Sequence, residues 1–232
     1  MEKLDVLYED NQIIVVLKPQ NVPTQSDDSR DLDLLTMVKN YVKEKYNKPG
    51  EAYIGLVHRL DRPTGGIMVF ARTSKSASRL TEQFKNHTTE KIYYAVTENL
   101  VKYKKDTLVN YLQKNEKENI VQVVPMSVTG AKKAELYYEE LDNDGKHSLL
   151  EIHILTGRSH QIRVQLANIG CPLYGDNKYG KNKSKSTNNL GLWAGKLTFI
   201  HPTTKEKMVF MSMPDTTKLP WKNFKMEKYF VR

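Results

Sequence analysis

The stretch HRLDRPTGG, from His58 to Gly66, contains four ionisable side chains, a proline and a pair of glycines. Apolar residues flank it in the sequence: GLV directly precedes it and IMVF directly follows it. Proline and glycine are typical of sharp bends in a chain. The sequence therefore predicts a tight turn ahead of a buried strand, with a single carboxylate, Asp61, between Arg59 and Arg62.

Apolar runs of strand length recur along the rest of the chain and are separated by turn residues. Strands are predicted at residues 12–17, 66–71, 91–97, 119–124, 134–141, 147–155, 196–200 and 207–211. The turn sequence Asn143-Asp144-Gly145 predicts an antiparallel hairpin, and HPTTKE separates the strands of a final hairpin. The lysine-rich segments 101–118 and 181–189 are expected to be the least structured, and the second has the composition of a mobile loop.

Three segments have the apolar spacing of helices. The first covers residues 32–46 and ends before Pro49-Gly50. The second is expected to begin at Ser74 as N-cap, and the third to begin at Ser159 as N-cap and to stop at Gly170. The expected buried stripes are Ala77, Leu80 and Phe84 in the second helix, and Ile162, Leu166 and Ile169 in the third. Strands with three helices predict an α+β fold, organised as one catalytic-sized domain over residues 1–232.

Composition limits the classes of function. The chain of 232 residues has a formal net charge of +9, which favours a polyanionic partner such as nucleic acid, although many lysines also simply keep a protein in solution. One cysteine, Cys171, excludes a disulfide framework and a cysteine-based zinc site. The N-terminus is polar and no apolar run is long enough to cross a membrane, so we expect a cytoplasmic protein with no membrane partner. A monomer is expected, since no surplus amphipathic helix is present.

No motif for a metal, a nucleotide cofactor or a serine nucleophile is present in the sequence. Polar residues at bends remain as candidates, and the first of these is Asp61. A second group of candidates surrounds the start of the third predicted helix and consists of Arg158, His160, Gln161 and Arg163. A third group, Lys91 and Tyr93, lies on one side of a predicted strand. Each has a structural interpretation too: a turn-capping aspartate, a salt-bridge arginine, a core tyrosine. Taken alone, these patterns predict a basic, nucleic-acid-binding protein with an Asp–Arg site.

The same residues lie in motifs that resemble a known family. HRLDRPTGGIMVFART is similar to the signature of the RluA family of pseudouridine synthases, HRLD-x-x-T-S-G followed by an apolar strand. VVLKP, KIYYA, LTGRSHQIRVQLANIGCPLYGDNKYG and LWAGKLTFIHP resemble further family motifs, and they follow in family order from about residue 5 to residue 214. The departures are Gly65 in place of serine, Gln165 in place of histidine, and Trp193 in place of histidine. They leave local packing or substrate preference open.

This resemblance implies a fold, a reaction and a set of site residues. The fold would be a mixed, mostly antiparallel sheet with a few flanking helices and a central RNA-binding cleft. The reaction would isomerise specific uridines in ribosomal or transfer RNA to pseudouridine, without a cofactor or metal. The catalytic residues implied are Asp61 as the carboxylate, Arg163 as its ion-pair partner with Arg158 as the fallback, and Tyr93 as the active-site tyrosine. The S4-type domain that many members carry at the N-terminus is expected to be absent.

RNA contacts follow from the same resemblance and from the basic charge. The residues expected to contact RNA are His58, Arg59, Arg62, Lys91, Arg158, His160, Gln161 and Lys178, and the lysines Lys181, Lys183 and Lys185 would add phosphate contacts. Arg59 is the candidate to fill the space that a flipped-out uridine leaves. His58 would contact the RNA backbone or support its own loop.

Two other functions share parts of this pattern. A non-catalytic RNA-binding protein on the same fold would need no nucleophile, so the joint presence of Asp61, Tyr93 and Arg163 argues against it. A base-releasing glycosylase would share the carboxylate and the flipped base, but it would leave an abasic site instead of pseudouridine.

Overall fold

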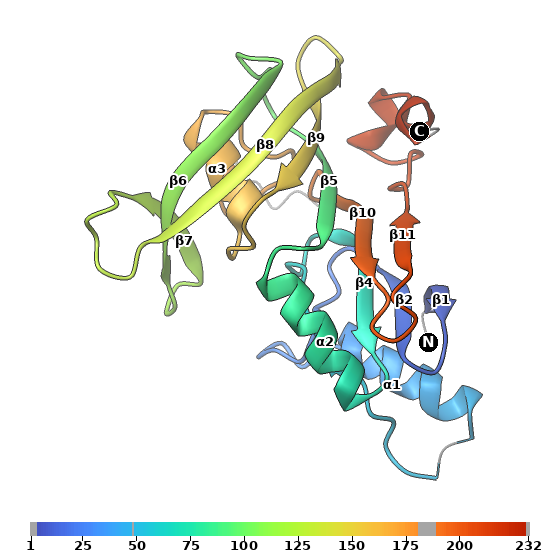
Figure 1. The fold of residues 1–232 in the computed structure, drawn as a ribbon. Coiled ribbons are helices and arrows are strands. Elements are labelled where there is room, and N and C mark those ends of the chain that lie inside the picture. The colour runs from blue at the N-terminus through green and yellow to red at the C-terminus, as the bar shows by residue number, and fades with distance from the viewer. Residues whose placement is uncertain (1–3, 48, 181–188, 231–232) are drawn as a thin grey trace. The chain divides into compact units, whose positions relative to one another are not determined.

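The apolar run that follows the charged turn lies beside an apolar run from the N-terminal part of the chain (Figure 1). In the computed structural model, which describes residues 4–47, 49–180 and 189–230, β2 (Ile13–Lys18) pairs antiparallel with β4 (Gly65–Ala71). Their register places Lys18 opposite Gly66. Every residue of β4 is buried, as expected for an apolar β-branched strand with both faces covered.

The chain divides into two compact units. Unit 1 comprises Met1–Glu90 and Ala194–Ser212, and unit 2 comprises Lys91–Trp193 and Met213–Arg232. Each unit has its own cluster of buried apolar side chains: Ile13, Val69, Leu80 and Phe199 are among those of unit 1. In unit 2 the cluster includes Tyr94, Leu149, Trp221 and Met226.

Unit 1 contains strands in the order β1-β2-β4-β10, with β3 beside β4 and β11 beside β10. Its two helices, α1 and α2, begin at true caps, since the side chain of Asp33 accepts a hydrogen bond from Thr36 N and that of Thr73 accepts one from Ser76 N. The prediction of Ser74 as N-cap was wrong by one residue, because Thr73 is still extended and Ser74 is already helical. The remaining elements are β1 (Asp5–Glu9), β3 (Gly55–Leu56), α1 (Leu34–Lys45), α2 (Ser74–Lys85), β10 (Leu192–Ile200) and β11 (Lys207–Met211).

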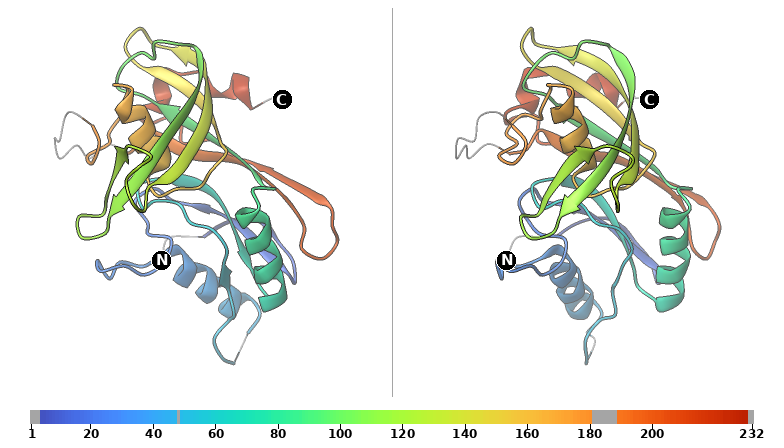
Figure 2. Two further views of the ribbon diagram at one scale, coloured as in Figure 1. Left: turned by 60° about the vertical axis from the view of Figure 1, so that its left-hand side comes forward. Right: turned by 90° about the vertical axis from the view of Figure 1, so that its left-hand side faces the viewer.

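Unit 2 contains strands in the order β5-β9-β8-β6-β7, and each of these neighbours pairs antiparallel. Figure 2 shows β6 and β8 as long strands side by side. Val164 of α3 packs with the buried side chains Leu112 of β6, Val121 of β7 and Ala134 of β8. The elements are β5 (Glu90–Val96), β6 (Lys105–Asn115), β7 (Ile120–Val124), β8 (Lys132–Asn143), β9 (Ser148–Ile154), α3 (Gln161–Asn168) and the 3-10 turns Trp221–Asn223 and Met226–Tyr229.

The α+β prediction is confirmed, and so are both hairpins, with Gly145 at φ 83° in the first. The expectation that residues 101–118 are among the least structured was wrong, because β6 occupies Lys105–Asn115. Its strand pattern is carried by only two buried side chains, Leu108 and Leu112, on one face. Residues 181–188, where a mobile loop was expected, lie outside the described residues.

The predictions for the third helix were partly wrong. Its N-cap is His160, in the left-handed conformation with φ 51°, and no side chain caps the helix. Ile169 is 40% exposed and so lies outside the expected buried stripe. Gly170 does end the helix, with φ 80°. The helix is buried on nearly every side from Gln161 to Leu166, so polar residues lie inside the unit.

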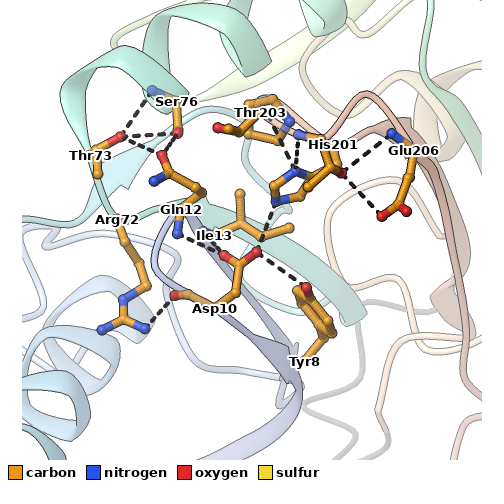
Figure 3. A network of polar contacts seen from close by, with 12 residues as sticks. Tyr8, Asp10, Gln12, Ile13, Arg72, Thr73, Ser76, His201, Thr203 and Glu206 are labelled. Atoms are coloured by element: carbon orange, nitrogen blue, oxygen red, sulfur yellow. Dashed lines mark hydrogen bonds and ion pairs between the residues drawn. The ribbon is translucent and has the colours of Figure 1, made fainter.

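A polar network ties the ends of the unit 1 strands together (Figure 3). Buried His201 after β10 lies 2.9 Å from Asp10, with Nε2 facing the carboxylate. The other imidazole nitrogen, Nδ1, accepts from the backbone N–H groups of Thr203 and Thr204. His201 is thereby fixed between the β1–β2 turn and the β10–β11 turn, and it serves the fold of this unit.

Lys18 supports the charged turn from inside unit 1. Its side chain is fully buried, and its ammonium group donates to the carbonyl oxygens of Pro19, Val22 and Arg62 at 3.0, 2.5 and 2.9 Å. Burial lowers the pKa of Lys18 to about 7, an effect that the nearby charge of Asp61 partly opposes. An ammonium that binds three carbonyls at once holds the turn in a single position.

Gly66 should be intolerant of a side chain. A Cβ atom there would lie 2.3 Å from the carbonyl oxygen of Ala194, and the residue has φ 124°. We expect Gly66→Ala to lower the free energy of unfolding by about 3 kcal/mol or more, since overpacking and backbone strain add. Gly145→Ala is the control, because φ is also positive but nothing lies within 4 Å of its Cβ. Urea unfolding should show a loss of only about 1 kcal/mol there; equal losses would contradict the packing argument.

Lys18 should make stability depend on pH. Its folded pKa of about 7 lies below the ordinary value of 10.5, so the unfolded chain binds more protons between these two values. The free energy of unfolding should therefore rise with pH in that window, by up to about 1.4 kcal/mol per pH unit. The Lys18→Met variant lacks this titrating group, so its free energy of unfolding, measured with urea, should rise less between roughly pH 7 and roughly pH 9. Identical slopes for the two proteins would show that Lys18 remains charged in the fold.

Candidate active site

Asp61 begins the turn that leads into β4. The backbone N–H of Thr64 donates to the carbonyl oxygen of Asp61 at 2.9 Å, which closes the bend. Residue Leu60 is buried and anchored, because its carbonyl oxygen accepts from the hydroxyl of Thr24 at 2.8 Å. On the other side of the bend, Gln20 donates to the carbonyl oxygen of Pro63 at 3.1 Å. The backbone on both sides of Asp61 is thus fixed to the β2 end of unit 1.

The two arginines that flank Asp61 differ. Arg59 is exposed. Arg62 is held by the preceding loop: its guanidinium donates to the carbonyl oxygen of Asn21 at 3.1 Å and to the hydroxyl of Ser29 at 2.9 Å. It also forms ion pairs with two exposed carboxylates, those of Asp27 and Asp31. Contacts between exposed charges are weak, and so a phosphate group can compete for Arg62.

His58 supports the turn from below. Its ring stacks on Phe84 of α2, with centroids 4.4 Å apart. Its Nε2 accepts from the backbone N–H of Val69 at 3.1 Å, so that nitrogen carries no proton. Of the two roles considered from the sequence, these contacts favour support of the loop.

Unit 2 contributes Tyr93 and Lys91 from β5. Alternation along the strand places them on the same face, as predicted. Tyr93 is 9% exposed. Burial lowers the pKa of Lys91, and its ammonium lies 3.8 Å from the position that a Cβ atom on Gly157 would take.

Arg163 lies within α3 and is 5% exposed. Its Nε and Nη2 donate to the two carboxylate oxygens of Asp176 at 2.8 and 2.7 Å, which is a bidentate ion pair. Burial alone would raise the pKa of Asp176, but the guanidinium of Arg163 keeps this pKa below its usual value. The predicted partner of Arg163, Asp61, belongs to the other unit, and that pairing stays a prediction.

Tyr179 joins Arg163 to the start of the helix. Its ring lies under the guanidinium, with 5.2 Å from the central carbon to the ring centroid. The hydroxyl of Tyr179 accepts from Val121 N at 2.9 Å and lies 2.6 Å from Nδ1 of His160. His160 is 9% exposed and is therefore an internal residue in this unit.

Gln161 organises the loop before α3. Its side-chain oxygen accepts from Thr156 and from Arg158 N, at 2.8 and 3.0 Å. Its side-chain nitrogen donates to the carbonyl oxygen of Glu135 at 3.0 Å. Arg158 itself is exposed, and its Nε donates to the carbonyl oxygen of Lys133. Gln161 thus presents Arg158 at the surface.

The structure gathers the predicted residues of unit 2 around α3 and β5, and those of unit 1 at the charged turn. Sequence reasoning gave no role to Asp176 or Tyr179, although both lie in the GDNKYG segment that was matched to the family. A buried arginine needs a carboxylate as its ion-pair partner, and this requirement could have indicated Asp176 as the partner of Arg163. Lys178 lies between them in the sequence, and its ammonium group donates to the carbonyl oxygen of Asn119 at 2.7 Å. Lys181, Lys183 and Lys185 lie outside the described residues.

The three departures from the family motifs lie in packed positions. Gly65 is buried in β4. Gln165 is fully buried and donates to the carbonyl oxygen of Leu108 and to the side chain of Asn110, at 3.0 and 2.8 Å. Trp193 packs against the apolar cluster of unit 2. Their contacts lie inside their own units, so these three departures from the family motifs affect local packing.

Among the described residues, no cluster of three or more His, Cys, Asp and Glu side chains could bind a metal ion. In the same part of the chain, no helix has the length and apolar character needed to cross a membrane.

Comparison with known proteins identifies the family. Residues 12–168 match the family model described as RNA pseudouridylate synthase. The uncharacterized RNA pseudouridine synthase YhcT of Bacillus subtilis is 32% identical over 89% of this chain and 67% of its own length. Ribosomal large subunit pseudouridine synthase C of Buchnera aphidicola is 30% identical over 88% of this chain and 65% of its own. The chain thus spans about two thirds of the length of these relatives.

The fold has a counterpart among solved structures. The structure of human RNA pseudouridylate synthase domain containing 4 covers 94% of this chain and aligns over 90% of its own, with a TM-score of 0.77 and 22% identity. That similarity shows the same mixed, mostly antiparallel fold. The match of the family model over most of the chain and the identity to its relatives show that this protein belongs to the RNA pseudouridylate synthase family and is an RNA pseudouridine synthase, an isomerase.

Proposed function

We propose that this enzyme converts specific uridines of ribosomal or transfer RNA to pseudouridine, with Asp61 as the catalytic carboxylate and units 1 and 2 acting as one catalytic domain. The observation that carries the assignment of Asp61 is the turn: the side chains of Lys18, Gln20 and Thr24 each donate a hydrogen bond to its backbone, at Arg62, Pro63 and Leu60. A single carboxylate on a rigid turn suits a nucleophile or base that must keep one position. A relative named as a ribosomal large subunit pseudouridine synthase supports ribosomal RNA as one target class.

The isomerisation needs an ionised carboxylate. The bond between N1 of uracil and C1′ of ribose breaks, the base turns, and C5 bonds to C1′. The proton lost from C5 is balanced by one gained at N1. Asp61 would act as a nucleophile towards the ribose or the base, or abstract a proton in an elimination route.

Arg163 is proposed to keep Asp61 ionised. Desolvation by bound RNA would disfavour a charged carboxylate, and a guanidinium within a few ångströms opposes this. Arg163 is suited to the role because it is buried and held in one position by Asp176.

Tyr93 is proposed to contact the target base. Its ring can stack on uracil, and its hydroxyl can help to remove the C5 proton. Lys91 lies on the same face of β5, and its lowered pKa is consistent with a partly desolvated position near the substrate.

The remaining polar residues are proposed to bind RNA. A uridine in folded RNA must flip out, at a cost of a few kcal/mol, and exposed Arg59 is the candidate to fill its place. Arg62, Arg158 and Lys178 would contact phosphates, which gives affinity that falls with salt. His58, His160 and Gln161 would act through the loops that they hold, because each bonds to a group inside its own unit.

Asp61→Asn should abolish the reaction. In cells that lack this protein, complementation with wild type should restore pseudouridine at one or a few RNA positions, and Asp61→Asn should not. Asp33→Asn is the matched control in unit 1, since Asp33 caps α1 and asparagine caps almost as well. Pseudouridine mapping of total RNA measures both. Modification restored by Asp61→Asn would remove Asp61 from the catalytic role, and abasic sites in the RNA would indicate a glycosylase.

Arg163→Met should lower both activity and stability. The single-turnover rate should fall by about 100-fold or more, because the carboxylate loses its cation. The free energy of unfolding should fall by about 3–5 kcal/mol, because Asp176 is left as an uncompensated buried charge. The double variant Arg163→Met/Asp176→Leu should recover most of the stability and none of the rate. A near-normal rate in either variant would rule out the pairing of Arg163 with Asp61.

A further inference from the structure

We propose that the exposed loop of residues 25–32 is a displaceable competitor of RNA: Asp27 and Asp31 occupy the guanidinium of Arg62, and an RNA phosphate binds there only by displacing them. The loop thereby lowers the affinity of the enzyme for RNA, and RNA binding releases the loop from the charged turn. This inference rests on the proposed function, in which Arg62 contacts a phosphate. All of the residues involved belong to unit 1.

The first step is the set of acceptors around the guanidinium of Arg62. Its Nε donates to the carbonyl oxygen of Asn21 at 3.1 Å. Its Nη1 donates to the hydroxyl of Ser29 at 2.9 Å and to the carboxylate of Asp27 at 3.4 Å, and its Nη2 donates to the carboxylate of Asp31. Each of the three nitrogens thus has an acceptor, and three of these four acceptors belong to the loop. A phosphate that binds the guanidinium through two N–H groups therefore has to replace acceptors from the loop.

The second step is the charge around Arg62. The carboxylates of Asp27 and Asp31 both pair with this one guanidinium, which leaves an excess of one negative charge. Hydrogen bonds from Ser29 keep the pKa of Asp27 below its ordinary value, and the hydrogen bond from Arg62 does the same for the pKa of Asp31. Both carboxylates are therefore ionised at neutral pH. A phosphate that approaches Arg62 meets like charge, so the loop opposes its binding.

The third step is that the loop can move without unfolding unit 1. Both of its ends are fixed, because the backbone N–H groups of Leu34 and Leu35 donate to the carbonyl oxygens of Pro23 and Thr24, at 2.9 and 3.1 Å. Between these ends, residues 25–32 are all exposed. Release of the loop from Arg62 therefore leaves the start of α1 in place and removes no buried side chain from the core.

The loop also contains a turn of its own, which presents both carboxylates. The side chain of Asp27 accepts from the backbone N–H of Ser29 at 3.0 Å and from the hydroxyl of Ser29. The backbone N–H of Arg30 donates to the carbonyl oxygen of Asp27 at 3.3 Å, and that of Asp31 donates to the hydroxyl of Ser29 at 3.2 Å. These bonds do not involve Arg62, so the turn can leave the guanidinium as one piece.

Two other roles for the aspartates give different results. If they only order the loop, their removal changes stability slightly and leaves RNA affinity unchanged. If they hold Arg62 in the orientation that binds RNA, their removal weakens RNA binding. If they compete with phosphate, their removal strengthens it. The direction of the change in RNA affinity therefore separates the three roles.

The test is fluorescence anisotropy of a labelled ribosomal RNA fragment with the full chain. The Asp27→Asn/Asp31→Asn variant keeps a side-chain oxygen for the N–H of Ser29 but removes both charges from Arg62. We expect its dissociation constant for the RNA to fall about 5-fold, which is the effect of two weak, exposed ion pairs. In an Arg62→Gln background the same two substitutions should change the constant by less than about 2-fold, because the group for which carboxylate and phosphate compete is gone.

The matched control is Asp5→Asn/Asp28→Asn, which removes the same charge from two exposed positions of unit 1. Asp28 lies in the same loop, and among the described residues Arg62 forms its ion pairs with Asp27 and Asp31 and not with Asp28. The control should change the dissociation constant by less than about 2-fold. A gain in affinity equal to that of Asp27→Asn/Asp31→Asn would overturn the proposal, since net charge alone would then explain both.

Three further results would overturn the competition. They are an unchanged or weaker RNA affinity in Asp27→Asn/Asp31→Asn, a gain of about 5-fold that persists in the Arg62→Gln background, and no loss of affinity when Arg62→Gln is added to Asp27→Asn/Asp31→Asn. All of these variants change exposed side chains, and a melting temperature near that of wild type shows that they are folded. Failure of wild type to restore pseudouridine at any RNA position in cells would instead overturn the proposed function. Binding and modification are measured separately, so the two failures are distinguishable.

Discussion

A buried ammonium group holds the part of unit 1 on which the proposed chemistry depends. Lys18 ends β2, and its three carbonyl acceptors come from its own loop and from the turn that contains Asp61. Burying a charge is unfavourable unless it is fully hydrogen-bonded, and here the carbonyl oxygens provide that compensation. Burial still keeps the pKa of Lys18 below its ordinary value. Although burial of this charge is unfavourable, its hydrogen bonds restrict the backbone of the turn to one geometry.

Unit 2 contains a second buried charge, and it is compensated differently. Arg163 is matched by the carboxylate of Asp176, so the pair is neutral inside the unit. A buried pair of this kind adds little net stability compared with apolar residues, but removing one partner is costly. Its value is therefore in orientation: it specifies where a guanidinium lies. Each unit thus contains a buried cation that binds two or more oxygen acceptors: Lys18 in unit 1 and Arg163 in unit 2.

In contrast to Lys18 and Arg163, the other arginines proposed to bind RNA are not buried. Arg59 and Arg158 are exposed, and Arg62 is bound by exposed aspartates. Contacts of this kind are weak and screened by salt, so they can exchange with RNA phosphates. In the proposed function, rigid groups would serve the reaction and exchangeable groups would bind the RNA backbone. The formal net charge of +9 on the chain agrees with a polyanionic substrate.

The sequence by itself determined the α+β class, both hairpins and most strands, because apolar periodicity and turn motifs are local signals. Its short motifs also gave Asp61, Tyr93 and Arg163 as candidates for the site. It failed for β6, whose lysines hide a pattern of two buried leucines, and at the α3 cap, where His160 adopts a left-handed conformation. Only the tertiary structure decided that Lys18 binds three carbonyls and that Arg163 pairs with Asp176. Those contacts depend on burial and on partners up to 44 residues apart, which no local pattern encodes.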